Sequence, residues 1–236
     1  MNKRHQIHNL IILDESGSMH SIKQTAIQGF NEIVQTAKGI EKEHPEQEHF
    51  ISLVTFNGIR QKLVHFVDPV NKLEQIDDSN YHPNASTPLF DAIGFGINKL
   101  RQKVERGTDY NVLVTILTDG EENSSKEYSG RDIKSMIEAL KLNRWTFTYI
   151  GTDHDVEKMA SSISINNTMN FNKNEADMRM MFEKEKMARL RYSEKIKMKE
   201  KVGFDFYENE NSENNTKNVS TPAEARPSFW QKFFGN

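Results

Sequence analysis

Residues 9–18, NLIILDESGS, decide the fold of this chain. The unbroken apolar run Leu10–Leu13 is typical of a strand that is buried on both faces, as in a parallel sheet. Directly after the turn, apolar residues recur at helical spacing and predict an amphipathic helix. These residues are Ile22, Ala26, Gly29, Phe30, Ile33, Val34, Ala37 and Ile40. The oxygen-rich residues 14–18 therefore lie where a parallel strand ends and its crossover helix begins, the edge at which open α/β sheets bind ligands.

The chemistry of residues 14–18 suits a hard cation. Asp14 supplies a carboxylate, Ser16 and Ser18 supply hydroxyls, and Gly17 allows a tight turn between them. Mg2+ takes oxygen ligands in octahedral geometry at roughly 2.0–2.1 Å and usually keeps several waters. One carboxylate does not suffice, so a second is expected elsewhere in the chain. Taken alone, the segment is equally compatible with capping of the helix by Asp14 or Ser16.

The composition excludes several classes of protein. The chain has 236 residues, with 31 Lys and Arg against 34 Asp and Glu, and it has no cysteine. Disulfide frameworks and thiolate metal sites are therefore excluded, and the formal net charge of -3 gives no indication of nucleic-acid binding. The first ten residues lack the apolar core of a secretory signal, and no apolar run is long enough to span a bilayer. We expect a soluble cytoplasmic protein without stable membrane insertion.

Two closely spaced strand candidates predict an antiparallel edge of the sheet. His49–Phe56 ends at an Asn-Gly pair, and Gln61–Val67 follows so soon that the two strands must form a hairpin. Antiparallel edge strands are common on otherwise parallel sheets. Pro69–Ile76 is then a candidate for a short helix, with Pro69 near its start.

A second carboxylate and a third hydroxyl follow further along the chain. Pro88 suits a first helical turn, so Thr87 lies at a loop-to-helix junction, where it can also act simply as a cap. Asn111–Leu117 predicts another buried strand, and Asp119 follows its end as Asp14 follows the first. Parallel strands joined by right-handed crossovers bring their carboxyl ends to one rim. Two carboxylates and three hydroxyls can then converge on one cation, which capping alone explains poorly.

Three motifs resemble the metal-ion-dependent adhesion site of the von Willebrand factor type A domain family. They are Asp14-x-Ser16-x-Ser18, Thr87-Pro88-Leu89 and Asp119-Gly120. The alternation of strands and helices matches this family over roughly residues 6–200, and the stretches TFN, STPLFDAIG, TDGEENSS and WTFTYIG resemble its stand-alone bacterial and phage members. One departure lies before the threonine, where Ala85 and Ser86 stand in place of two frequent glycines.

The resemblance implies an α/β fold with a doubly wound, Rossmann-like and mostly parallel sheet, one antiparallel edge strand and helices on both faces. The domain would span residues 1–202 and end in a helix over about 174–201. The resemblance also implies a divalent cation with an open coordination position, which an Asp or Glu carboxylate of a partner protein would fill. Mg2+ is expected before Mn2+ or Ca2+, which also accept oxygen ligands. The implied metal-site residues are Ser16, Ser18 and Thr87, which would coordinate the cation, and Asp14 and Asp119, which would coordinate it directly or through water.

Further elements complete the predicted domain. Ile133 and Leu140 mark a helix, Trp145–Ile150 predicts a strand, and a last strand is expected within Ile163–Phe171. Asp153 follows the strand Trp145–Ile150 at the same rim as the metal loops. It can contact a partner there, although capping of a following helix is the more ordinary role.

The composition changes after residue 203. Residues 203–227 are rich in Asn, Glu and Ser and predict a disordered linker. Residues 228–236 then carry four aromatic side chains at positions i, i+1, i+4 and i+5, one face of a short helix. This end can dock into a groove of a partner or fold back on its own domain. Its aromatic residues are Phe229, Trp230, Phe233 and Phe234.

Two functions fit these residues. The first is a non-enzymatic adaptor that binds a partner carboxylate through its metal. The second is a Mg2+-dependent hydrolase, with Asp14 as nucleophile or with a metal-activated water. An aspartyl-nucleophile phosphatase usually has a second carboxylate two residues on, where this chain has Ser16, and neither common glycine-rich phosphate loop is present. The sequence therefore favours the binding module.

Overall fold

The strands form one mixed sheet. The computed structural model describes residues 4–104, 109–152 and 155–207. In these residues the strands are β1 (His5–Asp14), β2 (Gln47–Phe56), β3 (Gln61–Pro69), β4 (Tyr110–Thr118), β5 (Trp145–Gly151) and β6 (Asn167–Asn170). Their order across the sheet is β3-β2-β1-β4-β5-β6, and only β3 runs antiparallel to its neighbour. The predicted mostly parallel sheet with one antiparallel edge strand is confirmed.

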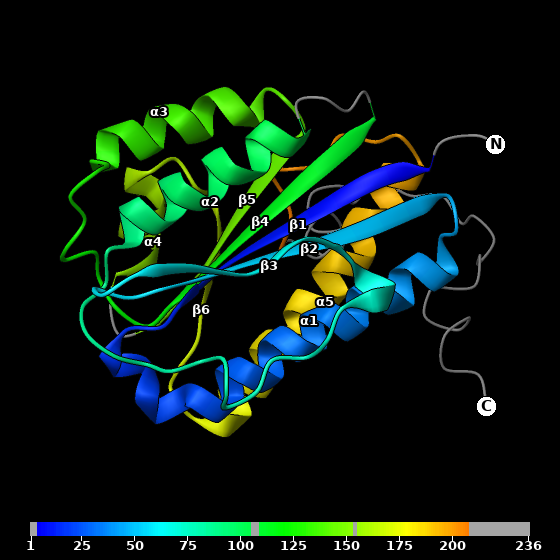
Figure 1. Cartoon of the computed structure of the whole chain (residues 1–236). Helices are drawn as coiled ribbons and strands as arrows, with labels where there is room; N and C mark the ends of the chain where they lie inside the picture. The colour runs from blue at the N-terminus through cyan, green and yellow to red at the C-terminus, as the bar shows by residue number, and fades with distance from the viewer. Residues whose placement is uncertain (1–3, 105–108, 153–154, 208–236) are drawn as a thin grey trace, which may run out of the picture.

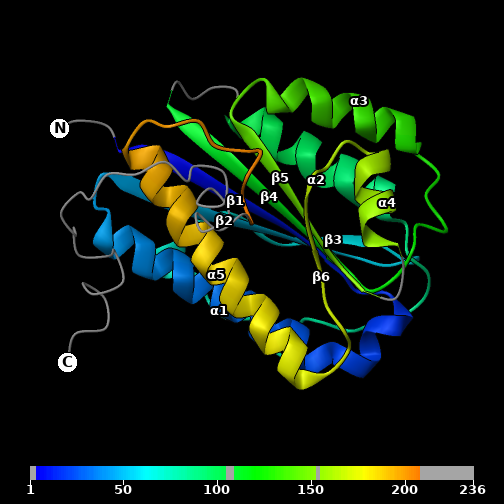
Figure 2. The same cartoon turned by 180° about the vertical axis from the view of Figure 1, so that it is seen from behind.

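Helices cover both faces of this sheet (Figure 1). The α-helices are α1 (Lys23–Glu43), α2 (Leu89–Val104), α3 (Gly130–Lys141), α4 (Val156–Ser162) and α5 (Glu175–Lys197), and the short 3-10 helices are η1 (Gly17–Ile22) and η2 (Val70–Lys72). α2, α3 and α4 pack on one face, and α1 and α5 lie side by side on the other (Figure 2). The doubly wound α/β architecture follows from these two layers.

β1 is central because its apolar run supplies both cores. Leu10 and Ile12 pack with the layer of α2, whereas Ile11 and Leu13 pack with the layer of α1. The stripe of α1 includes Gly29 because α5 approaches closely there: a Cβ at residue 29 would lie 1.6 Å from Cζ of Phe182. The two helices of this layer are therefore in direct contact.

A buried ion pair seats α5 on the sheet. Arg189 donates from Nε to Oε1 of Glu185 over 2.9 Å, from Nη1 to Oδ1 of Asn9 over 2.9 Å, and from Nη2 to Oγ1 of Thr115 over 2.6 Å. Tyr207 donates its hydroxyl to Oε2 of Glu185 over 2.7 Å. A buried charge is tolerated when it is paired and hydrogen-bonded in this way. The methionine-rich last helix is therefore an integral core helix, fixed to β1 and β4.

The helix expected at Pro69–Ile76 is largely absent. The structure forms only η2 there, and residues 73–76 have no regular secondary structure, because a side chain of α1 hydrogen-bonds to the backbone of this segment. Asn31 donates from Nδ2 to the carbonyl of Ile76 over 2.9 Å and accepts from the Ile76 amide at Oδ1 over 3.0 Å. These two hydrogen bonds satisfy the backbone donor and acceptor of Ile76, which a helix would otherwise satisfy.

The end of the domain also differs from the prediction. α5 stops at Lys197 rather than near residue 201, because Lys199 takes a left-handed conformation with φ of 59°. The linker start expected at residue 203 is too early, since Phe206 is buried and its ring lies 5.7 Å from that of Tyr192 between centroids. The aromatic side chains of residues 206 and 207 give this short segment the apolar area that the following polar residues lack.

Three further points concern the helix after β5, membrane insertion and the residues that the structure does not describe. A helix forms after β5, as the capping role considered for Asp153 requires, but the cap of this helix, α4, is Asp155, whose side chain accepts the amide of Lys158 over 3.0 Å. Among the described helices, none has the length and apolar character needed to cross a membrane. Asp153, the rest of the predicted linker and the aromatic end lie outside the described residues.

A buried histidine in β1 predicts acid sensitivity of the fold. His8 is 4% exposed, stacks on Phe50, and burial lowers its pKa from 6.5 to about 4. The unfolded chain therefore binds a proton that the folded chain refuses, so stability falls as the pH falls from 6.5 towards 4. When the pH falls from 8 to 5, wild type should lose the stability that the neutral His8 contributes, and His8→Phe should not. The unfolding free energy of His8→Phe relative to that of wild type should therefore increase by about 2 kcal/mol from pH 8 to pH 5.

Urea unfolding at both pH values measures this gain. His49, whose pKa burial lowers to about 3, is present in both proteins and contributes equally to both. Identical pH profiles for wild type and His8→Phe would show that residue 8 is not the acid-sensitive group.

Candidate metal site

The carboxylate of Asp14 is held by both strands at the centre of the sheet. Asp14 is the last residue of β1, and its Oδ1 accepts the amide of Ser16 over 2.7 Å. Its Oδ2 accepts the hydroxyl of Thr118, the last residue of β4, over 2.6 Å. The parallel register, in which Leu13 pairs with Leu117, brings these two strand ends together. The orientation of Asp14 is therefore fixed by the sheet itself.

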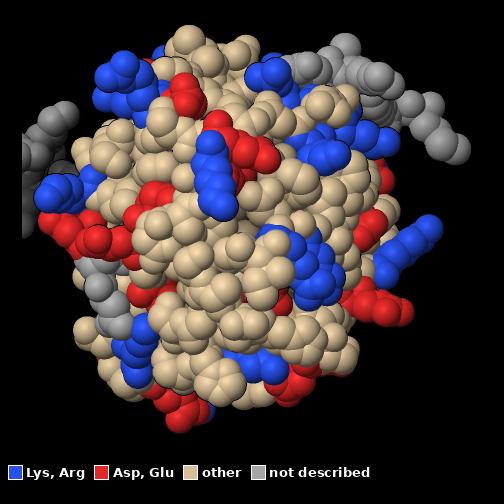
Figure 3. All heavy atoms as spheres, turned by 60° about the vertical axis from the view of Figure 1, so that its left-hand side comes forward, with Lys and Arg blue, Asp and Glu red and all other residues tan. Residues whose placement is uncertain are grey.

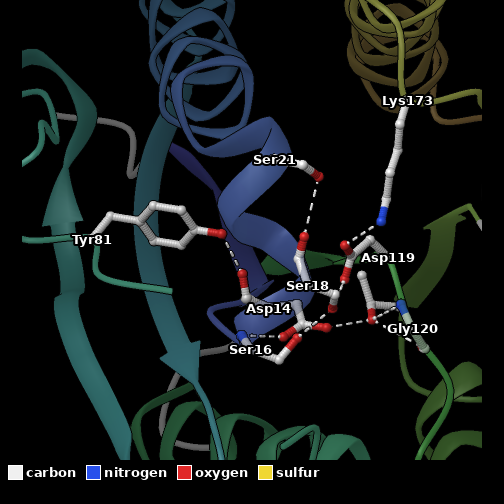
Figure 4. A network of polar contacts seen from close by, with 9 residues as sticks. Asp14, Ser16, Ser18, Ser21, Tyr81, Asp119, Gly120 and Lys173 are labelled. Carbon is white, nitrogen blue, oxygen red and sulfur yellow. Dashed lines mark hydrogen bonds and ion pairs between the residues drawn. The ribbon is translucent and has the colours of Figure 1, made fainter. Parts of the chain in front are cut away.

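Asp119 joins the same cluster through the serines of the first loop. Ser18 donates its hydroxyl to Oδ1 of Asp119 over 2.7 Å, and the hydroxyl oxygens of Ser16 and Ser18 are 3.2 Å apart. Figure 4 shows the side chains of Asp14, Ser16, Ser18 and Asp119 pointing toward one another. Ser18 is exposed, so the cluster reaches the surface.

Thr87 approaches the cluster from the loop before α2. Its amide donates to Oδ1 of Asn123 over 2.9 Å, and its carbonyl accepts the amide of Asn123 over 3.2 Å. A Cβ added at Gly120 would lie 3.7 Å from Oγ1 of Thr87 and 3.9 Å from Oγ of Ser18. The glycine thus leaves open a space bordered by two of the predicted hydroxyls. All five side chains of the motifs are gathered at one rim.

Three residues outside the motifs hold residues 14 and 15 in place through hydrogen bonds: Phe56, Tyr81 and Asn84. Tyr81 donates its hydroxyl to the carbonyl of Asp14. Glu15 donates its amide to the carbonyl of Phe56 over 2.8 Å, and its carbonyl accepts the amide of Asn84 over 2.9 Å. The ends of β1 and β2 and the loop before α2 are therefore connected through residues 14 and 15.

The electrostatics of the rim favour a cation. Asp14, Glu15 and Asp119 are 0%, 1% and 2% exposed. Burial raises the pKa of Asp14 to about 6, and the charge of Asp119 adds to this rise. The ammonium of Lys173 lies 2.7 Å from Oδ2 of Asp119. A divalent cation would relieve the cost of ionising carboxylates in this buried position.

The donor set fits a hard cation that accepts hydroxyl oxygens. In the described part of the chain, no group of three or more His, Asp or Glu side chains is placed to hold a metal. A cation at this rim would therefore depend on serine and threonine hydroxyls in addition to two carboxylates. Oxygen-only ligands suit Mg2+, Mn2+ or Ca2+.

Three residues of this site were not predicted from the sequence. Thr118 directly precedes the motif aspartate at a strand end, so its hydroxyl could have been expected near Asp14. Tyr81 and Lys173 carry no local signal, because their contacts join segments that are distant in the sequence.

The fold and the motifs agree with a comparison against protein families. A sequence model of the von Willebrand factor type A domain matches residues 10–184. The chain belongs to this family. Domains of this family generally mediate metal-dependent protein interactions and typically bind a divalent metal at a metal-ion-dependent adhesion site. A comparison with curated proteins found no match.

Solved structures share the fold at low sequence identity. The PilB minor pilin from Streptococcus sanguinis aligns with a TM-score of 0.54 and 13% identity, over 80% of this chain and 62% of the pilin. Proximal thread matrix protein 1 from the mussel byssus aligns with a TM-score of 0.50 and 13% identity, over 79% of this chain and 46% of that protein. The chain thus spans less than two thirds of either protein, and the likeness concerns the fold alone.

The face at which the parallel strands end has a mixed surface. Figure 3 turns the left-hand side of Figure 1 forward, where these strand ends lie. Lys and Arg side chains are interspersed with Asp and Glu around a broad area of uncharged residues. A partner would therefore meet charges of both signs around the rim.

The departure from glycine before Thr87 has an energetic consequence. Ala85 has a φ of 61°, in the left-handed region that favours glycine, and its carbonyl accepts the amide of Gly17 over 2.9 Å. Ala85→Gly removes the steric cost of the Cβ and should stabilise the domain by about 1 kcal/mol. The melting temperature should rise by about 2–4 °C.

Ser86→Gly is the matched control for this variant, because it adds glycine flexibility at a neighbouring residue without a positive φ. It should not raise the melting temperature. Equal melting temperatures for Ala85→Gly and wild type would contradict the assigned strain.

Proposed function

We propose that this domain is a metal-dependent protein-binding module. A divalent cation, most readily Mg2+, is held at the rim and receives a carboxylate from an Asp or Glu of a partner protein. The observation that carries the proposal is the hydrogen-bonded cluster of two buried carboxylates and two serine hydroxyls at adjacent strand ends. The proposed metal-binding residues are Asp14, Ser16, Ser18, Thr87 and Asp119.

The residues of the cluster have distinct roles in this proposal. Asp14 and Asp119 balance the charge of the cation, and the three hydroxyls are neutral ligands. Thr118 and the amide of Ser16 orient Asp14 without contacting the cation. The bound cation supplies one open coordination position for the partner carboxylate. Because two carboxylates neutralise a divalent cation, the site stays near neutral and still attracts an anionic ligand.

We propose binding rather than hydrolysis for this rim. Hydrolysis needs a group that accepts a proton from water or from the attacking nucleophile. In the described residues, the side chains that contact the two carboxylates are the hydroxyls of Ser16, Ser18 and Thr118 and the ammonium of Lys173. Hydroxyl and ammonium groups are poor proton acceptors, and in this proposal both carboxylates balance the charge of the cation and are not free to accept a proton, which supports a non-enzymatic module.

Asp14→Asn tests the metal site. An amide cannot balance the charge of the cation, so the variant should lose at least tenfold in affinity for Mg2+ and Mn2+. The fold should survive, because Oδ1 of the amide can still accept the Ser16 amide and Thr118 can donate to the carbonyl of Gly120, 3.1 Å from its hydroxyl. Isothermal titration measures the affinity. Asp78→Asn, which removes an exposed carboxylate, is the control.

The folding stability of Asp14→Asn should also depend on pH differently from that of wild type. The raised pKa of Asp14 means that the folded protein keeps a proton that the unfolded chain releases near pH 4. Wild-type stability therefore falls as the pH rises from 4 to 6. In chelator at pH 8, Asp14→Asn should be more stable than wild type by up to about 3 kcal/mol. Unchanged metal affinity in Asp14→Asn would refute the site assignment, and a destabilised variant would refute the account of its burial.

Chelation tests the partner contact. A partner bound to immobilised wild-type protein in Mg2+ should dissociate in chelator, and it should fail to bind Asp119→Asn. Changing one acidic residue of that partner to its amide should weaken binding by about 2–5 kcal/mol, which is at least thirtyfold. Surface plasmon resonance with the purified partner measures both effects. A partner that binds equally well in chelator would place recognition elsewhere on the surface.

Two further partner contacts stay predictions. In the sequence, Asp153 follows soon after the strand β5, whose end lies at the rim. The aromatic end of the chain can provide a second attachment point for the same partner. Its four aromatic residues are Phe229, Trp230, Phe233 and Phe234.

A further inference from the structure

Lys173 places a fixed positive charge inside the proposed metal site. Its Nζ lies 2.7 Å from Oδ2 of Asp119, whose side chain is 0% exposed, while the Lys173 side chain is 22% exposed. The other oxygen of the same carboxylate, Oδ1, accepts the hydroxyl of Ser18. Both oxygens of Asp119 are therefore engaged by groups of this chain. Figure 4 shows Lys173 extending to Asp119 from the segment that precedes α5.

The backbone around Lys173 is anchored on both sides. Phe171 is buried and donates its amide to the carbonyl of Gly151 over 3.2 Å. Asn174 caps α5, with Oδ1 accepting the amide of Asp177 over 2.9 Å. Lys173 lies between these anchors, so its ammonium is tethered within reach of Asp119. The contact is therefore more than a chance pairing of two flexible surface side chains, which contributes little.

We propose that Lys173 sets the metal affinity of this site as a tethered cation that shares Asp119 with the divalent cation. The inference rests on the proposed function, because it needs a divalent cation at this rim. Two positive charges near one carboxylate repel each other, and the ammonium must either leave Oδ2 or stay beside the bound metal. Both arrangements weaken the binding of the metal. In return, Lys173 neutralises a buried carboxylate when no divalent cation is bound.

Two opposite effects follow from removing this charge. Lys173→Met keeps the length of the side chain without its charge, so it should bind Mg2+ and Mn2+ at least about fivefold more tightly than wild type. In chelator, the same variant should melt at a lower temperature, because Asp119 loses its ion-pair partner. A residue with a purely structural role would not tighten metal binding.

Two control variants isolate the charge at this position. Lys173→Arg keeps a positive charge beside Asp119 and should keep the affinity close to that of wild type. Lys184→Met removes a positive charge from an exposed position on α5, and should change neither the metal affinity nor the melting temperature in chelator. Isothermal titration with Mg2+ and Mn2+ and thermal unfolding in chelator provide the two readouts.

The outcomes separate this inference from the proposed function. Metal binding that is equally tight or weaker in Lys173→Met than in wild type overturns the role of Lys173 and leaves the metal site in place. Tightening in Lys184→Met to the same degree also overturns it, because the effect would then come from net charge. If neither wild type nor Lys173→Met binds a divalent cation, the proposed function fails and the inference fails with it.

Discussion

The hydrogen bond from Thr118 to Asp14, 2.6 Å long, joins the ends of the two central strands, and the candidate site depends on it. It forms because β1 and β4 are parallel neighbours in a register that brings both strand ends to the same rim. The apolar run of β1 makes that register the stable one, since each of its faces is covered by a different helical layer. The position of the motif residues is thus a consequence of how the core is packed. Ligand binding at the carboxyl edge of an open α/β sheet follows the same rule.

The second constraint on the site is electrostatic. The fold buries three carboxylates within one pair of loops, and Lys173, in the segment just before α5, places a positive charge against one of them. α5 anchors this segment, because its own buried ion pair fixes the helix to β1 and β4 and its apolar side chains pack on α1. The helix that completes the core therefore also determines the charge at the rim. This coupling between packing and charge distinguishes the site from a set of independent helix caps.

Much of this arrangement could be predicted from the sequence, because it depends on local pattern. The strand at Leu10–Leu13, the hairpin and the gathering of Asp14 with Asp119 follow from apolar runs, short turns and the rule for parallel crossovers. The missed features depend on tertiary contacts. Asn31 binds the backbone of Ile76 where a helix was predicted after β3. Phe206 is buried and extends the domain past its predicted end, and Lys173 reaches Asp119 from a segment distant in the sequence. No periodicity within a single segment encodes such contacts.

We propose that one divalent cation binds among the oxygens of the two strand-end loops. Anomalous diffraction from crystals of the wild-type protein grown with Mn2+ tests it most directly. We expect one strong anomalous peak within about 2.0–2.6 Å of hydroxyl oxygens from both Ser16 and Thr87. A strong peak only at exposed carboxylates elsewhere, with Ser16 and Thr87 free of metal at saturating Mn2+, would contradict it.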